Sequence, residues 1–450
     1  MKVLHITPHL GGGVGTVVRN YLEYVNRNSP NEHSLLSLEI LNDQSKEFLF
    51  KIKCDFVEQA FLTPTLITDS IDDSDVVLVH WWNHPLLQYF LMNVTLPESR
   101  LIFWSHISGS PTPNSFCQFA LSYPDRFIFT TPLSRFSNEV NTLSVEAQSK
   151  IGCIWSTAGV ERLSPFDENR DAEQLDGVSY VGNLDYTKLH KGFLEACSTL
   201  ISMGHHVNVI GPNTDDFLKD LQKVPMNQRP VVHGFVSEKR KFEILQNSRI
   251  FGYPLARHNY ATCDQALQEA MFFGTVPVVL NNPMETYMVK HRVNGLVASS
   301  LTEYSKLVGE LIEDKNEFKK LRENSRDFAR KAYSIKKMAD SWENEFALLL
   351  KTKKKKRQCL KQIRGHELRG CEVFIESLGS NSALFKFHLD ATTNQESLIL
   401  ESQIKCLSSL PQWSSSSKST PSHYSSHFPD DPVLRQWARL TRFIPCDQVQ

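Results

Sequence analysis

The stretch from Arg249 to Leu280 constrains the fold of this chain more than any other. Its first apolar run ends at a proline, which is typical of a buried strand that gives way to a loop. A helix is expected next, capped by Thr262 or Asp264 and closed by Gly274. A second apolar run at residues 276–280 predicts another buried strand. The segment therefore predicts a strand, loop, helix and strand of a parallel α/β sheet.

The polar loop of this unit stands at the carboxyl end of its first strand, where open α/β sheets bind ligands. The helix that follows presents free amide groups and the positive end of its dipole, which suit a phosphate group. Glu269 lies about a turn and a half inside the helix, where its carboxylate is expected to reach a ribose. An ordinary strand–helix–strand unit of any doubly wound domain would show the same pattern.

Length and composition limit the classes of protein that this chain can belong to. Its 450 residues are enough for two domains and an extension. The 49 Lys and Arg residues nearly balance 50 Asp and Glu, which argues against general binding to nucleic acid. Nine cysteines without a Cys-x-x-Cys pair indicate reduced thiols in a cytoplasmic setting rather than a zinc ribbon or a disulfide framework. The sequence shows neither the apolar core of a signal peptide nor a run of membrane-spanning length.

The first part of the chain alternates short apolar runs with polar or helical segments, which predicts a parallel sheet with helices on both faces. A glycine-rich loop at residues 11–16 follows the first strand and lets the backbone approach a phosphate or a sugar, with Gly12 and Gly13 as the candidate contacts. The strands expected here are Lys2–Thr7, Ser34–Leu38, Val76–His80, Leu101–Trp104, Phe127–Thr130 and Ile151–Trp155.

Aromatic and polar residues gather at two strand ends of this part, at residues 80–85 and 104–109. Aromatic faces beside polar groups suit a sugar, so His106 is a candidate functional residue there, although a strand-end histidine is otherwise often a packing residue. The sequence Asp73-Ser74-Asp75 permits a metal-binding interpretation. Its position directly before a strand favours an ordinary strand entry, and no metal site is predicted.

A polar linker at residues 161–177 is expected to lead into a second domain. Its first strand ends in a turn that carries Asn183 and Lys188, and a lysine at such a turn is either a phosphate contact or simply solvated. A glycine turn precedes Phe235 and Val236 at the end of a later strand. The strands expected in this domain, besides the two within residues 249–280, are Val178–Gly182, His206–Ile210 and Val231–Val236.

The segments Glu269-Ala270-Met271 and Gly274–Val279 resemble the donor-site signature of family 4 retaining glycosyltransferases with the GT-B fold. The glycine-rich loop is similar to the first loop of these enzymes, and Lys188 falls on the lysine that contacts the phosphates of the donor. The resemblance covers about residues 1–350 and is strongest at 178–297. Ala261 stands where the family has its first Glu, and Asn183 stands where it has an Arg.

The resemblance implies an α/β chain with the GT-B fold, in which two Rossmann-like parallel-sheet domains face each other across a cleft. The domains expected are 1–160 for the acceptor and 178–335 for the nucleotide sugar, followed by a helix at 336–350 that crosses back and an extension at 351–450. It implies transfer of a sugar from a nucleotide-diphosphate donor to a glycan, lipid or small-molecule acceptor with retention of configuration.

The resemblance also assigns site residues to this chain and implies that neither a metal nor a cofactor is needed. Charge on the leaving diphosphate would be stabilised by a lysine, by helix amides and by Arg257. The catalytic candidates are His106, Lys188 and Glu269. The donor-binding candidates are Gly12, Gly13, Asn183, Lys188, Phe235, Val236, Arg257, Asp264, Gln265, Ala266 and Glu269.

The sequence is also compatible with two other functions. Without the Glu at Ala261 and the Arg at Asn183, the chain is also compatible with a GT-B domain that binds a sugar nucleotide or glycan without transferring it. A sugar-nucleotide epimerase shares the fold, but the carboxylate and histidine set that it needs is not evident. Asp264 and His258 are the nearest polar residues for a rebuilt sugar contact, and Asp264 is equally well explained as a helix cap.

The extension differs in composition from the rest of the chain. Six of the seven residues of Lys351–Arg357 are basic, which predicts either a solvated helix end or peripheral contact with an anionic membrane. Residues 408–427 are rich in serine and predict disorder. Residues 373–389 have modest strand character.

Overall fold

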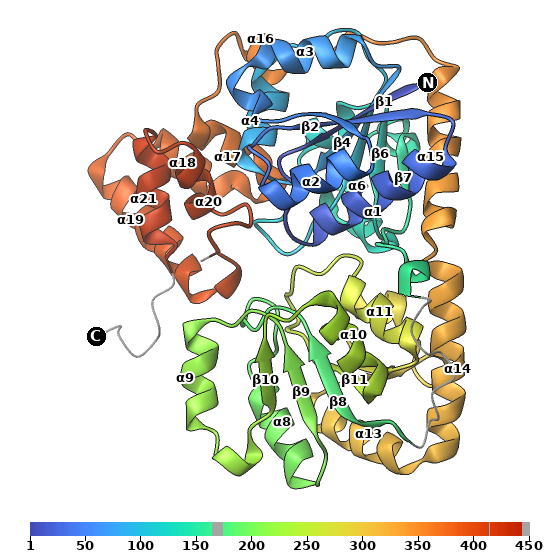
Figure 1. The fold of residues 1–450 in the computed structure, drawn as a ribbon. Coiled ribbons are helices and arrows are strands. Elements are labelled where there is room, and N and C mark those ends of the chain that lie inside the picture. The colour runs from blue at the N-terminus through green and yellow to red at the C-terminus, as the bar shows by residue number, and fades with distance from the viewer. Residues whose placement is uncertain (164–173, 414, 443–450) are drawn as a thin grey trace. The chain divides into compact units, whose positions relative to one another are not determined.

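The computed structural model describes residues 1–163, 174–413 and 415–442 and divides the chain into two compact units (Figure 1). Unit 1 comprises residues 1–156 and 338–450, and unit 2 comprises residues 157–337. Each unit is built on a parallel sheet of its own, so the predicted pair of Rossmann-like domains is confirmed. In the described part of the chain, each helix is too short or too polar to cross a membrane.

Unit 1 contains a seven-stranded sheet in the order β3-β2-β1-β4-β5-β6-β7, in which every neighbouring pair is parallel. The strand order reverses between β1 and β4, and ligands bind at the carboxyl ends of the strands at such a point. The sequence did not reveal the short strand β3. The strands are β1 (Lys2–Thr7), β2 (Glu32–Ser37), β3 (Asp55–Val57), β4 (Val76–Trp81), β5 (Leu101–Ser105), β6 (Arg126–Phe129) and β7 (Ile151–Cys153).

Helices of unit 1 bury the apolar faces of this sheet. Helix α15 runs from residue 335 to residue 350, and its Trp342 packs on Trp104 of β5 with 4.9 Å between ring centroids. The other helices between and beside the strands are α1 (Gly12–Asn28), α2 (Asp43–Lys51), α3 (Pro64–Asp72), α4 (Pro85–Asn93), α5 (Gln118–Ser122), α6 (Asn138–Asn141) and α7 (Val145–Ser149).

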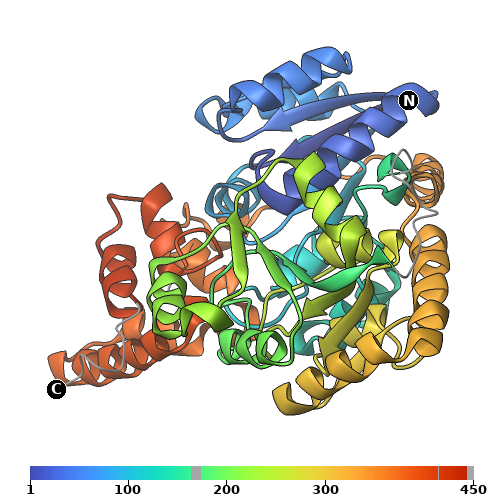
Figure 2. The same cartoon turned by 60° about the horizontal axis from the view of Figure 1, so that its bottom comes forward.

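Unit 2 contains a six-stranded parallel sheet in the order β10-β9-β8-β11-β12-β13 (Figure 2). The stretch from Arg249 to Leu280 forms β11, α11 and β12, and Gly274 ends α11 at a φ of 72°, as expected. The strands are β8 (Asp176–Val181), β9 (Val207–Ile210), β10 (Val231–Gly234), β11 (Ser248–Tyr253), β12 (Val276–Leu280) and β13 (Leu296–Ala298). The helices are α8 (Phe193–Ser202), α9 (Asp215–Lys223), α10 (Glu238–Asn247), α11 (Gln265–Phe273), α12 (Glu285–Met288), α13 (Leu301–Glu313) and α14 (Lys315–Ala332).

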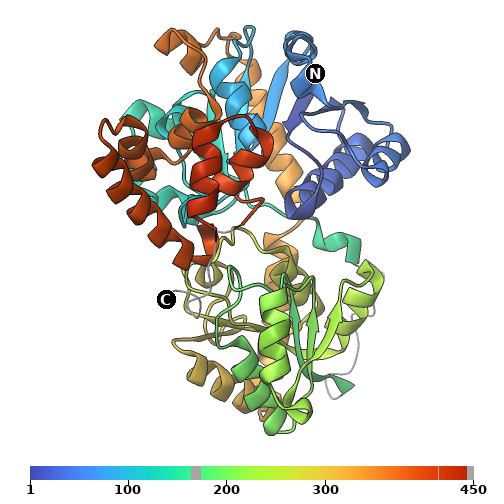
Figure 3. The same ribbon diagram turned by 90° about the vertical axis from the view of Figure 1, so that its left-hand side faces the viewer.

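The extension after residue 350 is a cluster of helices that packs on α4 of unit 1 (Figure 3). Its Phe374, Tyr424 and Trp437 are fully buried in the same apolar cluster as residues of β4 and β5. Residues 373–389 lie in helices rather than in a strand. The helices are α16 (Leu360–Arg364), α17 (Gly370–Ser377), α18 (Ala383–Asp390), α19 (Asn394–Cys406), α20 (Pro421–His427) and α21 (Pro432–Leu440).

The expectation of disorder at residues 408–427 is wrong for the part that the structure describes, all but residue 414. Trp413 and Tyr424 are buried, and Thr420 accepts a hydrogen bond from the His423 amide as the cap of α20. Pro421 occupies the first turn of that helix, where its missing N–H costs nothing. The serine-rich composition predicted disorder because it did not reveal that Trp413 and Tyr424 are buried or that Thr420 caps a helix.

The basic segment Lys351–Arg357 connects α15 to the extension along the surface of unit 1. Lys355 forms an antiparallel bridge with Ser99, and its Nζ lies 3.2 Å from Asp125 Oδ1. Arg357 pairs with the same carboxylate and donates to the Tyr123 carbonyl at 2.9 Å. Lys355 and Arg357 therefore attach the basic segment to unit 1 through ion pairs and a hydrogen bond.

Candidate functional site

The N-terminus of α11 lies at the carboxyl edge of the unit 2 sheet, directly after β11 and its loop. Asp264 is the residue before the helix, but its side chain makes no capping hydrogen bond. Instead, Asp264 Oδ1 accepts from Lys188 Nζ at 3.4 Å. Because a helix cannot satisfy the amides of its own first turn, those around Gln265 and Ala266 are suited to an anion.

Lys188 is brought to this helix end by the loop after β8. Its carbonyl accepts from the Ala256 amide at 2.8 Å, which fixes the loop beside the end of β11. Its side chain is only 12% exposed, and Nζ lies 5.2 Å from the centre of the Tyr253 ring. The structure therefore places one mostly buried cation next to helix amides, as the phosphate interpretation requires.

Glu285, at the start of α12, adds a second carboxyl group that the sequence did not single out as a site residue. Burial and, next, the neighbouring Asp264 carboxylate raise the pKa of Glu285 to about 7. Asn259 Nδ2 donates to Glu285 Oε1 at 3.1 Å. Glu285 Oε2 and Asp264 Oδ2 are buried and accept no hydrogen bond within the described part of the chain. Two polar atoms with unused bonding capacity thus lie in this region.

Glu269 is held by two cations within unit 2. Its Oε1 accepts from Arg162 at 2.6 Å and its Oε2 from Lys241 Nζ at 2.7 Å, and the carboxylate side chain is 6% exposed. Both cations also lie over the Phe242 ring, at 5.3 Å and 4.5 Å. No local sequence pattern predicts this arrangement, because Arg162 and Lys241 come from distant segments.

The other unit 2 candidates lie in loops at the ends of strands. Asn183 is exposed and donates to the Tyr260 hydroxyl at 3.4 Å. Phe235 is 90% exposed after β10, with Val236 partly buried beside it in sequence. Arg257 is exposed in the turn after β11. These positions are accessible, in contrast to Lys188 and Glu269.

In unit 1 the glycine-rich loop begins α1 directly after β1. Gly12 has a φ of 62°, and a Cβ there would meet no heavy atom within 4 Å. A Cβ at Gly15 would lie 1.8 Å from the Leu10 carbonyl oxygen, so only glycine permits this close packing of helix on loop. Gly13 lies between them in the first turn of the helix. The backbone near Gly12 is therefore open to an incoming group.

His106, after β5, ends a chain of four hydrogen-bonded imidazoles in unit 1. The distances between facing nitrogens are 2.9 Å for His33 and His5, 3.1 Å for His5 and His80, and 3.1 Å for His80 and His106. Burial lowers the pKa of His106 to about 3, so the ring is neutral near neutral pH. Because a neutral imidazole donates with one nitrogen and accepts with the other, the chain couples the tautomer of His106 to those of the other three histidines.

Comparison of the sequence with protein families gives one match that bears on this site. Residues 166–328 match the model of the family described as "Glycosyl transferases group 1". The matched region includes Lys188, α11 and Glu285 in unit 2. The comparison with curated proteins gave no match.

Solved structures with the same architecture are GT-B glycosyltransferases, and their likeness confirms the fold. Anabaena HepE, solved with UDP and glucose, is 12% identical with a TM-score of 0.59 over 77% of this chain and 100% of that one. A Rickettsia africae glycosyltransferase is 13% identical with a TM-score of 0.59, covering 78% and 99%. Sucrose-phosphate synthase of Thermosynechococcus elongatus is 10% identical with a TM-score of 0.57, covering 78% and 100%.

Proposed function

We propose that this protein is a glycosyltransferase that takes a sugar from a nucleotide-diphosphate donor and transfers it with retention of configuration. The observation that carries the proposal is the placement of Lys188 beside the N-terminus of α11 within the region that matches the family model. One mostly buried cation and a row of helix amides together suit a diphosphate. The Anabaena structures with UDP and with UDP-glucose support a donor of this kind.

Unit 2 supplies the charge stabilisation that the reaction needs. Negative charge builds on the leaving diphosphate as the glycosidic bond breaks, and fixed donors stabilise it without reorganising. Lys188 and the first-turn amides of α11 act here, with Arg257 as an exposed surface cation. Since these groups carry the charge, donor binding needs no metal ion. Phe235 offers an exposed aromatic face to the nucleobase.

The sugar of the donor is recognised by a set of residues that differs from the family pattern. Ala261 is buried and has no polar side chain to offer. Glu285 Oε2 and Asp264 Oδ2 both lack a hydrogen-bond donor within the described residues, and sugar hydroxyls would supply one. Sugar recognition therefore rests on Asp264 and Glu285 rather than on position 261.

Glu269 serves the ribose once a nucleotide is present, as the family resemblance suggests. In the structure its two oxygens are engaged by Arg162 and Lys241. A ribose hydroxyl can donate to either oxygen, because each carboxylate oxygen accepts more than one hydrogen bond.

The acceptor is a glycan, a lipid or a small molecule that unit 1 binds near Gly13 and His106. A neutral His106 can donate or accept one hydrogen bond at the acceptor. The protein works in the cytoplasm. Its Lys351, Lys353 and Lys356, which are exposed, favour peripheral contact with an anionic membrane that carries such an acceptor.

A second candidate function is binding of a sugar nucleotide or glycan without transfer. It is favoured by Asn183, which cannot supply the charge of the Arg in the family pattern, and by the apolar Ala261. It is also favoured by the closed ion pairs at Glu269.

Turnover separates the two candidates. Nucleotide sugars that raise the melting temperature of the full chain are selected first, since a ligand that binds only the folded state stabilises it. Each is then incubated with the protein, and release of the nucleoside diphosphate and the anomeric configuration of the product are followed by NMR. Release with retention supports the transferase. Binding without release supports the binding domain. The absence of any stabilising nucleotide sugar contradicts the transferase and leaves only a domain that binds a glycan.

A further inference from the structure

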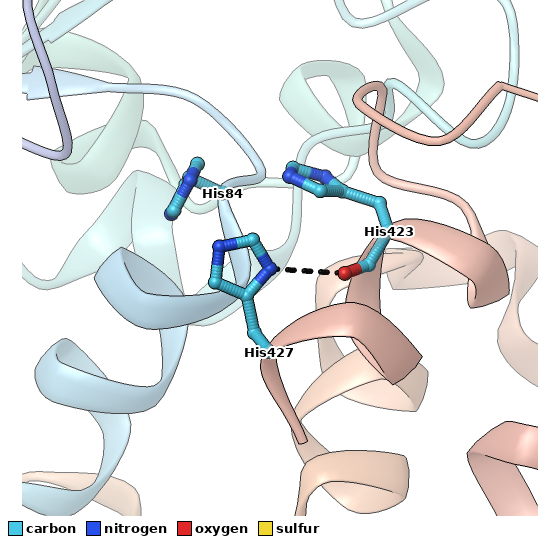
Figure 4. A group of neighbouring side chains, drawn as sticks. All are labelled: His84, His423 and His427. Carbon is cyan, nitrogen blue, oxygen red and sulfur yellow. Dashed lines mark hydrogen bonds between the residues drawn. The ribbon is translucent and has the colours of Figure 1, made fainter. Parts of the chain in front are cut away.

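Three imidazoles, drawn in Figure 4, and one neighbouring carboxylate in unit 1 join the extension to the sheet domain. His84 stands at the start of α4, after β4, and Glu39 follows β2. His423 and His427 come from α20 of the extension. None of these residues belongs to the nucleotide site in unit 2 or to the histidine chain that ends at His106.

The nitrogens of the three histidines converge. One ring nitrogen from each of His84, His423 and His427 lies within 4.8 Å of the others. Their ring centroids are 4.9 Å, 5.1 Å and 5.1 Å apart. Three imidazoles on one tetrahedral ion, with metal–nitrogen bonds of about 2 Å, place their ring centroids roughly 5 Å apart. The arrangement in Figure 4 therefore already has the spacing of a three-histidine site.

Glu39 supplies the negative charge that a cation needs at this place. Its Oε1 lies 3.2 Å from His84 Nε2 and 2.9 Å from His427 Nε2. Oxygen and nitrogen ligands of a tetrahedral ion lie about 3.3 Å apart, given metal–ligand bonds near 2 Å. His9 also places a ring nitrogen within 4.8 Å of both Glu39 and His84, on the side of the first loop.

Hydrogen bonding around the cluster orients the rings. His427 Nδ1 lies 3.0 Å from the carbonyl oxygen of His423, and since a carbonyl only accepts, Nδ1 carries the proton there. His427 Nε2 then faces the Glu39 carboxylate either as a bare lone pair or with a second proton. A positive centre is therefore required between Nε2 and Oε1, and a metal ion fulfils the requirement as well as a proton does.

His84 is buried, and its two ring nitrogens have different surroundings. It is 1% exposed, and its Nδ1 is buried with no hydrogen-bond partner in the described part of the chain. Nε2 of the same ring faces Glu39 Oε1 at 3.2 Å and is the nitrogen on the side of the carboxylate. His423 is the weaker ligand of the set, because its Nδ1 accepts the Ser419 amide at 3.2 Å and must give up that contact in the metal-binding tautomer.

We propose that His84, His423, His427 and Glu39 form a binding site for a divalent transition-metal ion of the zinc type. Three imidazoles and one carboxylate are the ligands that zinc prefers over the hard cations magnesium and calcium. The ion fastens α20 to the loops after β2 and β4, across 388 positions of the chain between Glu39 and His427. The site is structural and stands apart from sugar transfer.

Metal content and affinity of the full-length protein test the proposal. The chain is stripped with a chelator, and zinc is titrated back by calorimetry while the melting temperature is followed. We expect one tight site, a higher melting temperature with zinc, and no comparable effect of magnesium. Cobalt as a probe should give the intense visible bands of a four-coordinate nitrogen and oxygen site.

Variants locate the site. His427→Ala and Glu39→Gln should each weaken zinc binding by about 100-fold or more, because even loss of a residue that only orients a ligand costs 10–100-fold. His206→Ala is the matched control, since that side chain is 79% exposed in unit 2. Circular dichroism before titration shows whether each variant is folded. If a variant does not fold, the cobalt spectrum of the unmodified chain decides by itself.

Three outcomes would overturn the proposal. The first is a stripped chain that takes up no zinc at one equivalent. The second is a cobalt spectrum typical of an ion held by water alone. The third is folded His427→Ala and Glu39→Gln variants that bind zinc as the unmodified chain does. In each case His427 and Glu39 would form a simple ion pair.

Discussion

Lys188, Asp264 and Glu285 show how single side chains prepare the unit 2 edge for a ligand. Lys188 has one carboxylate partner at 3.4 Å, which is a long and weak contact, so a phosphate can compete for the ammonium group. Asp264 and Glu285 are close enough that the charge of one raises the pKa of the other. The Asp264 carboxylate therefore favours the protonated form of Glu285.

The raised pKa of Glu285 predicts a pH dependence of the stability of unit 2. Its pKa is about 7 in the folded chain against a usual value of 4.5, so folded unit 2 keeps a proton that the unfolded chain releases. The stabilisation is complete below about pH 4.5 and is lost as the pH rises through about 7. Glu285→Gln, which mimics the protonated form, should remove this loss and be more stable at pH 8 by up to about 3 kcal/mol.

Urea unfolding at pH 5, 6, 7 and 8 measures this difference. All seven tryptophans lie in unit 1, so unfolding of unit 2 is taken from circular dichroism after comparison with tryptophan fluorescence. Glu310→Gln, a change of an exposed carboxylate on α13, is the control. Parallel pH profiles of the Glu285→Gln variant and the unmodified chain would show that Glu285 is ionised in the folded state throughout.

Among the elements, the helices of the extension contribute to the core of unit 1 rather than forming a tail. Trp437 of α21 is fully buried and donates from Nε1 to His388 Nδ1 at 3.1 Å. Its ring also packs near Phe374 and Phe385, at centroid distances of 5.7 Å and 5.0 Å. These contacts join α17, α18 and α21 around one aromatic centre.

Trp437→Ala should therefore destabilise unit 1. Truncating a buried tryptophan leaves a cavity and costs about 3–5 kcal/mol, which lowers the melting temperature by roughly 10 °C. Leu398→Ala on α19 is the control, because Leu398 is 65% exposed. The remaining tryptophans report the transition by fluorescence. Equal melting temperatures for the two variants would mean that the extension does not pack on unit 1 in solution.

The elements also show what the sequence can and cannot reveal. The path from β11 through α11 to β12 follows from local apolar runs and a glycine that ends the helix, so it was predicted correctly. The fully buried Trp437 and Tyr424 lie in or beside a serine-rich region whose average composition suggests disorder. Local averages miss such anchors, because burial is decided by contacts with α4 and α17 far away in the chain.

Side-chain pairing across distant segments escapes prediction for the same reason. The sequence predicted that Glu269 contacts the ribose of a nucleotide. In the structure, Arg162 and Lys241 already donate to the Glu269 carboxylate. No metal site was predicted from the sequence, although His423 and His427 stand four positions apart, a spacing that places two ligands on one face of a helix. His84 and His427 meet only after the strands and α20 are assembled.

On the scale of the whole molecule, the candidate site residues are distributed over two parallel-sheet units. Unit 2 holds the cation, the helix end and the paired carboxyl groups at one sheet edge. Unit 1 holds the open glycine loop, the histidine chain and the extension. The central claim is that unit 2 binds the diphosphate of a donor through Lys188 and α11.

Calorimetric titration of the full chain with nucleoside diphosphates and their sugars tests this claim most directly. Lys188→Ala removes a charge-assisted contact worth about 1.5–3 kcal/mol, so the affinity for the preferred diphosphate should fall about 10- to 100-fold. Lys191→Ala, an exposed lysine three positions on, should leave the affinity unchanged. If the two variants bind the diphosphate equally well, or if the unmodified chain binds none, Lys188 and the N-terminus of α11 do not form a donor site.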